Sequence, residues 1–230
     1  MKLVNKKGKP FTWSFSSLNE FLTCPNKYAA KRFYCDVSDP PTVHTEWGTR
    51  VHLALEERVR DKKPLPEGMG HWEKWAAAIE NANGEIFCER QICLDRNLEP
   101  TGWFDEDAWC RGVIDVLIIQ EDKATLIDYK TGKKKSDDTQ LVLFSGMISL
   151  LYPEIDIFNY KYIWLKEDTT TGGTADRKRV VEELHGSNGV LDRVKRMEKA
   201  WEDEDFPCSP SGLCRGWCPV ESCIHWRPKR

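Results

Sequence analysis

The sequence predicts an α/β protein in which a mixed β-sheet is flanked by helices. Three observations indicate this class. Helical periodicity fills the first third of the chain, strand-like alternation fills the middle, and the last third alternates between the two patterns. With 230 residues the chain is long enough to bury a substantial core. We expect a single domain over residues 1–230.

The first third is expected to form three helices. Serines suited to capping open the segment 14–34, which has apolar residues at helical spacing and is interrupted at Pro25. A Pro-Pro break precedes a second helix over roughly 46–60. A third helix is expected over 71–83, where Gly84 ends it.

The middle of the chain changes to β-branched segments separated by turns, as expected of a meander. An apolar helix with acidic residues in its first turn follows, then two strands around a TTTGG turn and a last helix. The expected segments are strands 85–95, 109–120 and 123–130, a helix 137–153, strands 157–168 and 176–186 around a turn at 169–173, and a helix 188–204.

Composition restricts the class of protein. With 40% hydrophobic and 31% charged residues, the chain is typical of a folded globular protein. No apolar run approaches the ~20 residues of a membrane-spanning helix, and the start MKLVNKKGKPFTW lacks the apolar region of a signal peptide. We therefore expect a cytoplasmic protein without a membrane partner, in the host cytoplasm if it is viral. The net charge of −3 provides no global field for nucleic acid, although a local cationic groove would suffice.

The stretch LIDYKTGKKK places an acid and a base where an apolar strand meets a cationic loop. Side chains alternate along a strand, so Asp128 and Lys130 project from one face. On the preceding strand, Asp115 is the acidic member of an apolar row at the odd-numbered positions 113–119. A carboxylate buried there needs a cation, a metal or hydrogen-bond donors. If the two strands pair as a hairpin, Asp115 and Asp128 converge beside Lys130.

Two carboxylates at one point repel each other, and a divalent ion relieves that repulsion. Oxygen ligands with open water positions suit Mg²⁺ or Mn²⁺. Such an ion can activate water and stabilise a pentavalent phosphate, while Lys130 neutralises charge or orients the nucleophile. The alternative is a salt bridge between Asp128 and Lys130 at a strand end, together with a tolerated buried Asp115.

Other polar residues are candidates for the same site. His52 and Glu56 are four residues apart and share a helix face, from which a ring nitrogen can turn towards the metal or the scissile phosphate. A structural histidine is the alternative. Gln140 can bond a phosphate or a base, or lie exposed to solvent. A lysine run after the strand favours contact with the DNA backbone, with a solvated turn as the alternative. It comprises Lys133, Lys134 and Lys135.

The nine cysteines indicate metal ligands before disulfides, because nine is odd and the expected compartment is reducing. Four of them crowd the tail and predict a thiolate-bound metal, either tetrahedral Zn²⁺ or an iron–sulfur cluster. The four tail cysteines are Cys208, Cys214, Cys218 and Cys223. Within the tail, Cys208 and His225 are alternative ligands to the other three cysteines. The dispersed cysteines are expected to be core or surface thiols, and they are Cys35, Cys88, Cys93 and Cys110.

The succession GTRVH, GVIDVLI, LIDYK and QLVLF resembles the PD-(D/E)XK nuclease superfamily, and especially its RecB-like branch, which includes CRISPR-adaptation nucleases and phage exonucleases. The resemblance implies a restriction-endonuclease-like core over residues 44–166. It departs from the family at Phe144, which stands where the family has a tyrosine, so the role of that hydroxyl is not carried over.

The resemblance also implies roles for the site residues. The metal would be bound by His52, Asp115 and Asp128, with the backbone carbonyl of Tyr129 as a further ligand. Catalysis would be assisted by Lys130, and the substrate would be contacted by Gln140.

A cysteine directly before a proline, Cys24 in FLTCPNKYAA, is similar to the Cys-Pro-x-Lys-Tyr stretch of iron–sulfur RecB-like nucleases. There, one N-terminal and three C-terminal cysteines hold a [4Fe-4S] cluster. The resemblance implies such a cluster joining residues 11–35 to 206–226, with Zn²⁺ as the alternative. The family's tail reads C-x2-C-x5-C, and here the middle cysteine is shifted by one. The implied ligands are Cys24, Cys214, Cys218 and Cys223.

Together these features predict a metal-dependent DNA exonuclease, acting at single-stranded or processed DNA ends in recombination or repair. The absence of a helicase motif suggests a stand-alone phage or mobile-element enzyme, with a recombination or repair protein as a candidate partner.

Trp103 and Trp217 are candidates for stacking on unpaired bases. Two alternatives remain, a non-catalytic DNA-binding or adaptor module stapled by zinc or a cluster, and a zinc-stapled protein that binds partners through its cysteines.

Overall fold

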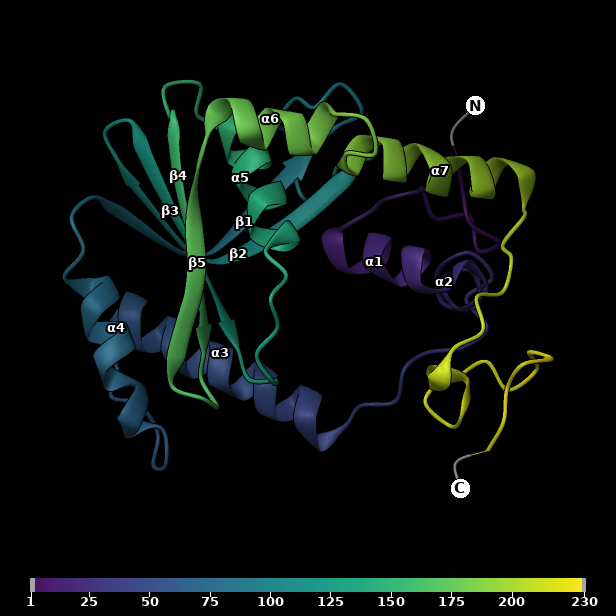
Figure 1. Cartoon of the computed structure of the whole chain (residues 1–230), viewed down its shortest axis with the longest axis horizontal. Helices are drawn as coiled ribbons and strands as arrows, with labels where there is room; N and C mark the ends of the chain where they lie inside the picture. Colours follow the sequence, from purple (N-terminus) through teal and green to yellow (C-terminus); the bar gives the residue numbers. More distant parts are fainter. Residues whose placement is uncertain (1–2, 229–230) are drawn as a thin grey trace.

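The computed structural model describes residues 3–228, so residues 1–2 and 229–230 of the predicted domain lie outside the described residues. Within that range the centre is a five-stranded sheet in the order β1-β2-β3-β4-β5 (Figure 1). Neighbouring strands are antiparallel except β3 and β4, which are parallel. The strands are β1 Glu85–Leu94, β2 Cys110–Gln120, β3 Lys123–Lys130, β4 Ile157–Trp164 and β5 Thr169–Asp176.

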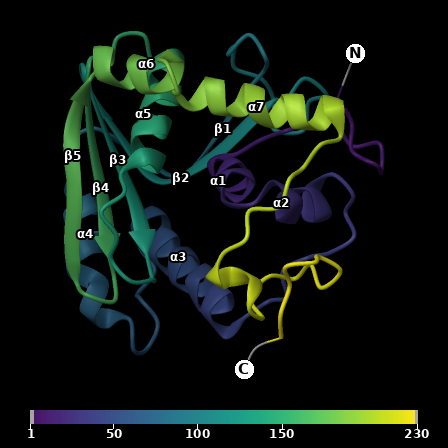
Figure 2. The same cartoon turned by 45° about the vertical axis from the view of Figure 1, so that its right-hand side comes forward.

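Helices cover both faces of the sheet. One face carries α3 and α4 and the other α5 and α6, while α7 runs beyond the sheet over α1 and α2 (Figure 1; Figure 2). The helices are α1 Phe15–Thr23, α2 Pro25–Arg32, α3 Val43–Asp61, α4 Glu73–Glu80, α5 Thr139–Leu151, α6 Arg177–His185 and α7 Val190–Asp203, with short 3-10 helices η1 Gly70–Trp72 and η2 Gly212–Cys214. The predicted α/β class with a restriction-endonuclease-like core is confirmed. No helix in the described part of the chain is long and apolar enough to cross a membrane.

Local signals explain the helix boundaries. Pro25 separates α1 from α2 and takes the first position of α2, where its missing amide removes no helical hydrogen bond. α3 begins at Val43, three residues before the expected start, because the Thr42 hydroxyl caps it by accepting from the Thr45 amide at 3.1 Å.

The sheet is buried on both faces. On β3, Leu126 packs in an apolar cluster shared with α1, α5 and α7, whereas Ile127 packs in a second cluster shared with α3 and α4. α5 is the crossover that joins the parallel strands β3 and β4. It places the side chains of its first turn beside the carboxyl end of β3, which is where the polar residues of LIDYK lie.

The side-chain alternation of β2 breaks around Asp115. Ile114 and Leu117 both pack in the cluster on the α5 side, whereas Val116 packs in the cluster on the α3 side. The prediction of one row at the odd-numbered positions 113–119 is therefore wrong.

An irregularity in the neighbouring strand accounts for this break. Glu89 of β1 has φ +49° and lies opposite Asp115, between the register pairs Cys88–Val116 and Arg90–Ile114. A left-handed residue is strained for a side chain other than glycine and turns the strand locally. Both strands exchange their inward and outward positions at this point.

Two segments of the last third were predicted wrongly. Residues 176–186, expected as a strand, form α6, in which Val180 and Leu184 are four apart and buried and Asp176 caps the helix. Residues 169–173, expected as a turn, belong to β5. The glycines there permit close strand packing, because a Cβ on Gly172 would lie 2.1 Å from the Tyr160 carbonyl oxygen.

The N-terminal segment is fastened to the sheet. The amide of Trp13 donates to the carbonyl of Trp109, and the amide of Arg111 donates to the carbonyl of Trp13, both at 2.9 Å. From the other side, Trp201 of α7 donates through Nε1 to the hydroxyl of Tyr28 at 3.1 Å. α1 and α2 are thereby held between β2 and α7.

The glycine of GVIDV is required by packing. A Cβ at Gly112 would lie 2.7 Å from Cε1 of the buried Phe144 ring. We predict that Gly112→Ala lowers the free energy of unfolding by about 1–3 kcal/mol through overpacking. Urea denaturation measures this loss, and Phe144→Leu added to Gly112→Ala should recover part of it. An unchanged urea midpoint in Gly112→Ala would contradict the packing argument.

Candidate active site

Asp115 bridges β2 and β3 where the two strands stop pairing. Their antiparallel register ends at the pair Val116 and Ile127. Beyond it, the amide of Tyr129 donates to Asp115 Oδ2 at 2.7 Å. A side chain thus satisfies a backbone donor that has lost its strand partner. The pairing of these two strands as a hairpin, predicted from sequence, is confirmed.

Asp128, Lys130 and Gln140 form a closed polar triangle. Lys130 Nζ lies 2.7 Å from Asp128 Oδ2 and donates to Gln140 Oε1 at 2.9 Å. Gln140 Nε2 in turn donates to Asp128 Oδ1 at 3.1 Å. Asp128 is only 6% exposed, and its buried Oδ2 faces the Lys130 ammonium. The shared contact with Gln140 confirms that Asp128 and Lys130 project from one face of β3.

A second polar group lies on the α3 side. His52 of α3, Glu89 of β1 and Asp115 of β2 each bring one ligand atom within 4.8 Å of the others. His52 Nδ1 lies 3.4 Å from Asp115 Oδ2. All three residues are half-buried. Sequence reasoning missed Glu89, and its signal is visible only once the register places it opposite Asp115.

Crowded charges shift the ionisation of this group. Burial, followed by the negative charge of Asp115, raises the pKa of Glu89 to about 7. Burial and Asp115 also raise the pKa of Asp128, against the opposing charge of Lys130. For His52, burial alone would lower the pKa, but the hydrogen bond and charge of Asp115 outweigh it and raise the pKa.

These residues fit a hard divalent cation. Two carboxylates and one imidazole converge in the His52 group, and the negative charge of Asp115 in this group acts on the buried carboxyl of Asp128. Such oxygen-rich ligands suit Mg²⁺ or Mn²⁺. Of the residues expected from sequence, His52 and Asp115 lie in the group, and Asp128 is held beside it by Lys130 and Gln140. Tyr129 contributes its amide to Asp115.

The His52 group is accessible from outside. A cavity of about 450 Å³ opens onto it, lined by His52, Glu56 and Glu89 together with the α3 residues around Gly48. His52 and Glu56 therefore face the same cavity, as their helical spacing predicts, although Glu56 is paired with Arg60. The lysine run lies in the exposed loop between β3 and α5 and comprises Lys133, Lys134 and Lys135.

The chain that leads into the tail passes α2 (Figure 1), where the amide of Asn26 donates to the carbonyl of Pro207 at 3.3 Å. The amide of Ser209 donates to Cys24 Sγ at 3.5 Å, and Cys208 Sγ lies 3.7 Å from Cys223 Sγ. Burial raises the pKa of Cys208 to about 11, aided first by Cys223 and then by Cys24 and Cys214. The other three thiols are thus within electrostatic reach of Cys208.

The other tail candidates take different positions. Cys218 accepts through its carbonyl from Trp226 Nε1 at 3.0 Å. His225 is half-buried and Trp217 largely exposed. Across residues 3–228, the cysteine sulfurs do not form a group of three as compact as the His52 group. Of the dispersed cysteines, Cys93 and Cys110 are buried, and Cys35 and Cys88 are half-buried; none of the nine, all of which are described, forms a disulfide.

Comparisons with known proteins identify a family and similar folds. The family model of the PD-(D/E)XK nuclease superfamily matches residues 12–108 and 108–223. Among solved structures, 32 chains match. One of them, "Crystal structure of SSO0001", is 14% identical, covers 93% of this chain and 85% of that chain, and has a TM-score of 0.50, which is a likeness of fold alone. No curated protein matches the chain.

The raised pKa of Glu89 gives metal binding a pH dependence. Below about pH 7 this carboxyl carries a proton that a cation must displace. We predict that Mn²⁺ affinity rises with pH between about 6 and 8, by up to about tenfold per unit. Calorimetry in buffers of different ionisation enthalpy measures the released protons. Glu89→Gln should weaken binding and release fewer protons, and an unchanged proton count in that variant would remove Glu89 from the site.

Proposed function

The chain belongs to the PD-(D/E)XK nuclease superfamily, and from that premise we propose that it is a Mg²⁺- or Mn²⁺-dependent DNA exonuclease of the RecB-like branch. The observation that carries the proposal is the convergence of acids from two strands beside one lysine. Burial and the negative charge of Asp115 raise the pKa of Asp128 at the end of the β2–β3 ladder, and Lys130 lies against Asp128. A fold that kept these residues only for stability would gain from replacing them with apolar side chains.

In the proposed mechanism, the site residues have different roles in phosphodiester hydrolysis. We assign the divalent ion to His52, Glu89 and Asp115, with Asp128 as the adjoining carboxylate and the Tyr129 carbonyl as a further candidate. When bound, such an ion supplies positive charge for the phosphate oxygens and lowers the pKa of water.

The remaining groups act through their own charges and hydrogen bonds. Lys130, desolvated beside Asp128, places a positive charge where the phosphorane gains negative charge. Gln140 holds Lys130 and Asp128 at a fixed separation, since it donates to one and accepts from the other. This preorganisation lowers the cost of reorganising the site during the reaction.

The substrate is proposed to be DNA with a single-stranded or processed end. The exposed lysine run beyond β3 lies next in sequence to Lys130 and suits contact with the sugar-phosphate backbone. The proposed setting is recombination or repair in the cytoplasm, with a partner protein of that pathway. The proposed lysine contacts are Lys133, Lys134 and Lys135.

The tail is proposed to hold a [4Fe-4S] cluster, with Zn²⁺ as the alternative. The contact of Ser209 with Cys24 supports a joint between residues 11–35 and 206–226, added to a catalytic core over 44–166 in a single domain. The proposed ligands are Cys24, Cys214, Cys218 and Cys223. Cys208 is an alternative ligand, because its sulfur lies beside that of Cys223.

Replacing the central acid or base tests the nuclease. Asp128→Ala and Lys130→Ala are predicted to lower metal-dependent cleavage of end-labelled DNA by about 100-fold or more. Asp128→Ala should leave the thermal unfolding midpoint unchanged or raise it, because it removes a buried carboxylate of raised pKa. The exposed variants Asp36→Ala and Lys166→Ala serve as matched controls. Undiminished cleavage in Asp128→Ala would refute the proposed site.

Replacing the cysteines one at a time tests the cluster. In anaerobically purified protein, Cys24→Ser and Cys218→Ser are predicted to lose the iron and the visible absorbance, whereas Cys208→Ser keeps both. Cys35→Ser is the control, since its thiol bonds Asn5 away from the tail. Metal analysis separates the alternatives, because zinc in place of iron excludes the cluster. If Cys208→Ser loses the iron and Cys218→Ser retains it, Cys208 is the ligand in place of Cys218.

A further inference from the structure

A large cavity adjoins the polar triangle on the side of the N-terminal helices. It has a volume of about 860 Å³ and reaches from Lys130 and Gln140, along the start of β2, to α1 and α2. Its volume lies within the range of about 300–1,000 Å³ that is usual for ligand sites. Among the described residues, five cations and no carboxylate line it, in a chain whose net charge is −3. The cations are Lys9, Lys31, Arg32, Arg111 and Lys130.

Two buried donors in the cavity wall have no acceptor. Trp13 is 3% exposed, and its Nε1 makes no hydrogen bond; the same holds for Nε of Arg111. Another part of the Arg111 guanidinium contacts the Cys93 thiol, where it opposes the rise in pKa that burial causes. Buried donors are normally satisfied, so two of them in one cationic cavity point to an acceptor that is supplied by a ligand.

The wall that carries these donors is rigid. Backbone hydrogen bonds of 2.9 Å join Trp13 to Trp109 and Arg111 to Trp13, and the two indole rings of Trp13 and Trp109 pack edge to face with centroids 5.5 Å apart. These contacts hold the indole of Trp13 and the backbone of Arg111 in place without the ligand, which favours a preorganised binding site.

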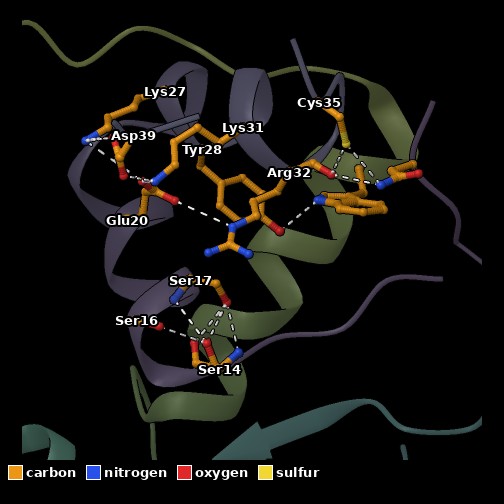
Figure 3. A network of polar contacts seen from close by, with 12 residues as sticks. Ser14, Ser16, Ser17, Glu20, Lys27, Tyr28, Lys31, Arg32, Cys35 and Asp39 are labelled. Carbon is orange, nitrogen blue, oxygen red and sulfur yellow. Dashed lines mark hydrogen bonds and ion pairs between the residues drawn. The ribbon is translucent and has the colours of Figure 1, made fainter. Parts of the chain in front are cut away.

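The amino-terminal end of α1 faces the same cavity. The residues around the Ser14 cap line it, and the positive end of a helix dipole favours an anion there. Figure 3 shows the hydroxyls of Ser14, Ser16 and Ser17 gathered at this end. It also shows that Lys31 is held by Glu20 and Asp39, so its charge is neutralised and Arg111 is the stronger anion ligand.

A flat apolar surface completes the cavity. Trp103 is half-buried in the connection between β1 and β2, and the guanidinium of Arg111 lies 5.6 Å from its ring centroid. An indole and a guanidinium plane together form the kind of platform on which an unpaired base stacks. A paired base has its neighbours above and below and does not reach such a recess.

We propose that this cavity binds the nucleotide next to the scissile phosphodiester, with its phosphate on Arg111, Trp13 Nε1 and the α1 end, and its unpaired base on Trp103. The inference rests on the proposed function, because the cavity shares Lys130 and Gln140 with the catalytic site. It assigns the selection of single-stranded DNA to residues outside the catalytic group.

Fluorescence anisotropy of a labelled single-stranded decamer with the full-length, metal-free protein tests this assignment. Trp13→Phe, which removes the indole N–H but keeps an aromatic ring, Arg111→Gln and Trp103→Ala should each weaken binding by about fivefold or more. Arg111→Gln should also reduce the slope of log affinity against log salt by about one. On a decamer with abasic sites, Trp103→Ala should have no further effect. Trp75→Phe and Arg96→Gln are matched controls, since both side chains are paired elsewhere.

Binding and cleavage are measured separately, so the cavity assignment and the nuclease proposal can fail independently. If the wild type cleaves DNA but Trp13→Phe and Arg111→Gln bind like the controls, the cavity assignment is overturned and the nuclease stands. If the wild type does not cleave while these variants lose affinity, the cavity binds DNA and the nuclease proposal fails. Photocrosslinking of a 5-iodouracil decamer to the wild type needs no variant. A crosslink at Trp103 supports the assignment, and crosslinks confined to other residues overturn it.

Discussion

The hydrogen bond from the Tyr129 amide to Asp115 Oδ2 lies where the ladder between β2 and β3 ends. It fixes one carboxylate so that it cannot rotate away from the next acid on β3. The remaining polar contacts follow from this constraint. Lys130 and Gln140 enclose Asp128, and His52 approaches Asp115 from α3. Each of these residues interacts with one of the two carboxylates, Asp115 or Asp128, that lie at the strand ends.

Such a site opposes the stability of the chain that carries it. Three carboxylates lie within a small volume, burial raises the pKa of two of them, and Glu89 holds a left-handed backbone conformation. The two apolar clusters on either face of the sheet provide the compensating free energy. A cation that binds only the folded chain would shift this balance further towards folding.

The apolar periodicity and the acid–base spacing on β3 sufficed to predict the first four strands of the sheet, the hairpin of β2 and β3, and the shared face of Asp128 and Lys130. Tertiary packing overrode local patterns elsewhere. The TTTGG stretch is a strand because β4 approaches Gly172 too closely for a side chain, a contact that has no local signal. Glu89 escaped detection because its role depends on a register with β2 and on a strained φ. Neither property is visible in the letters of β1 alone.

The wall between β2 and α7 joins residues that are far apart along the chain. Trp201 and Tyr28 are separated by 173 positions, yet their hydrogen bond supports the helices that close the cavity. Contacts between residues so far apart in sequence stabilise the fold only after a long loop has closed, and closing that loop costs conformational entropy. The β1–β2–β3 meander can form from neighbouring segments alone, whereas the cavity is complete only after α7 has docked. The acids of β2 and β3 are therefore brought together by contacts between neighbouring segments, whereas the recess beside them also depends on contacts between the two ends of the chain.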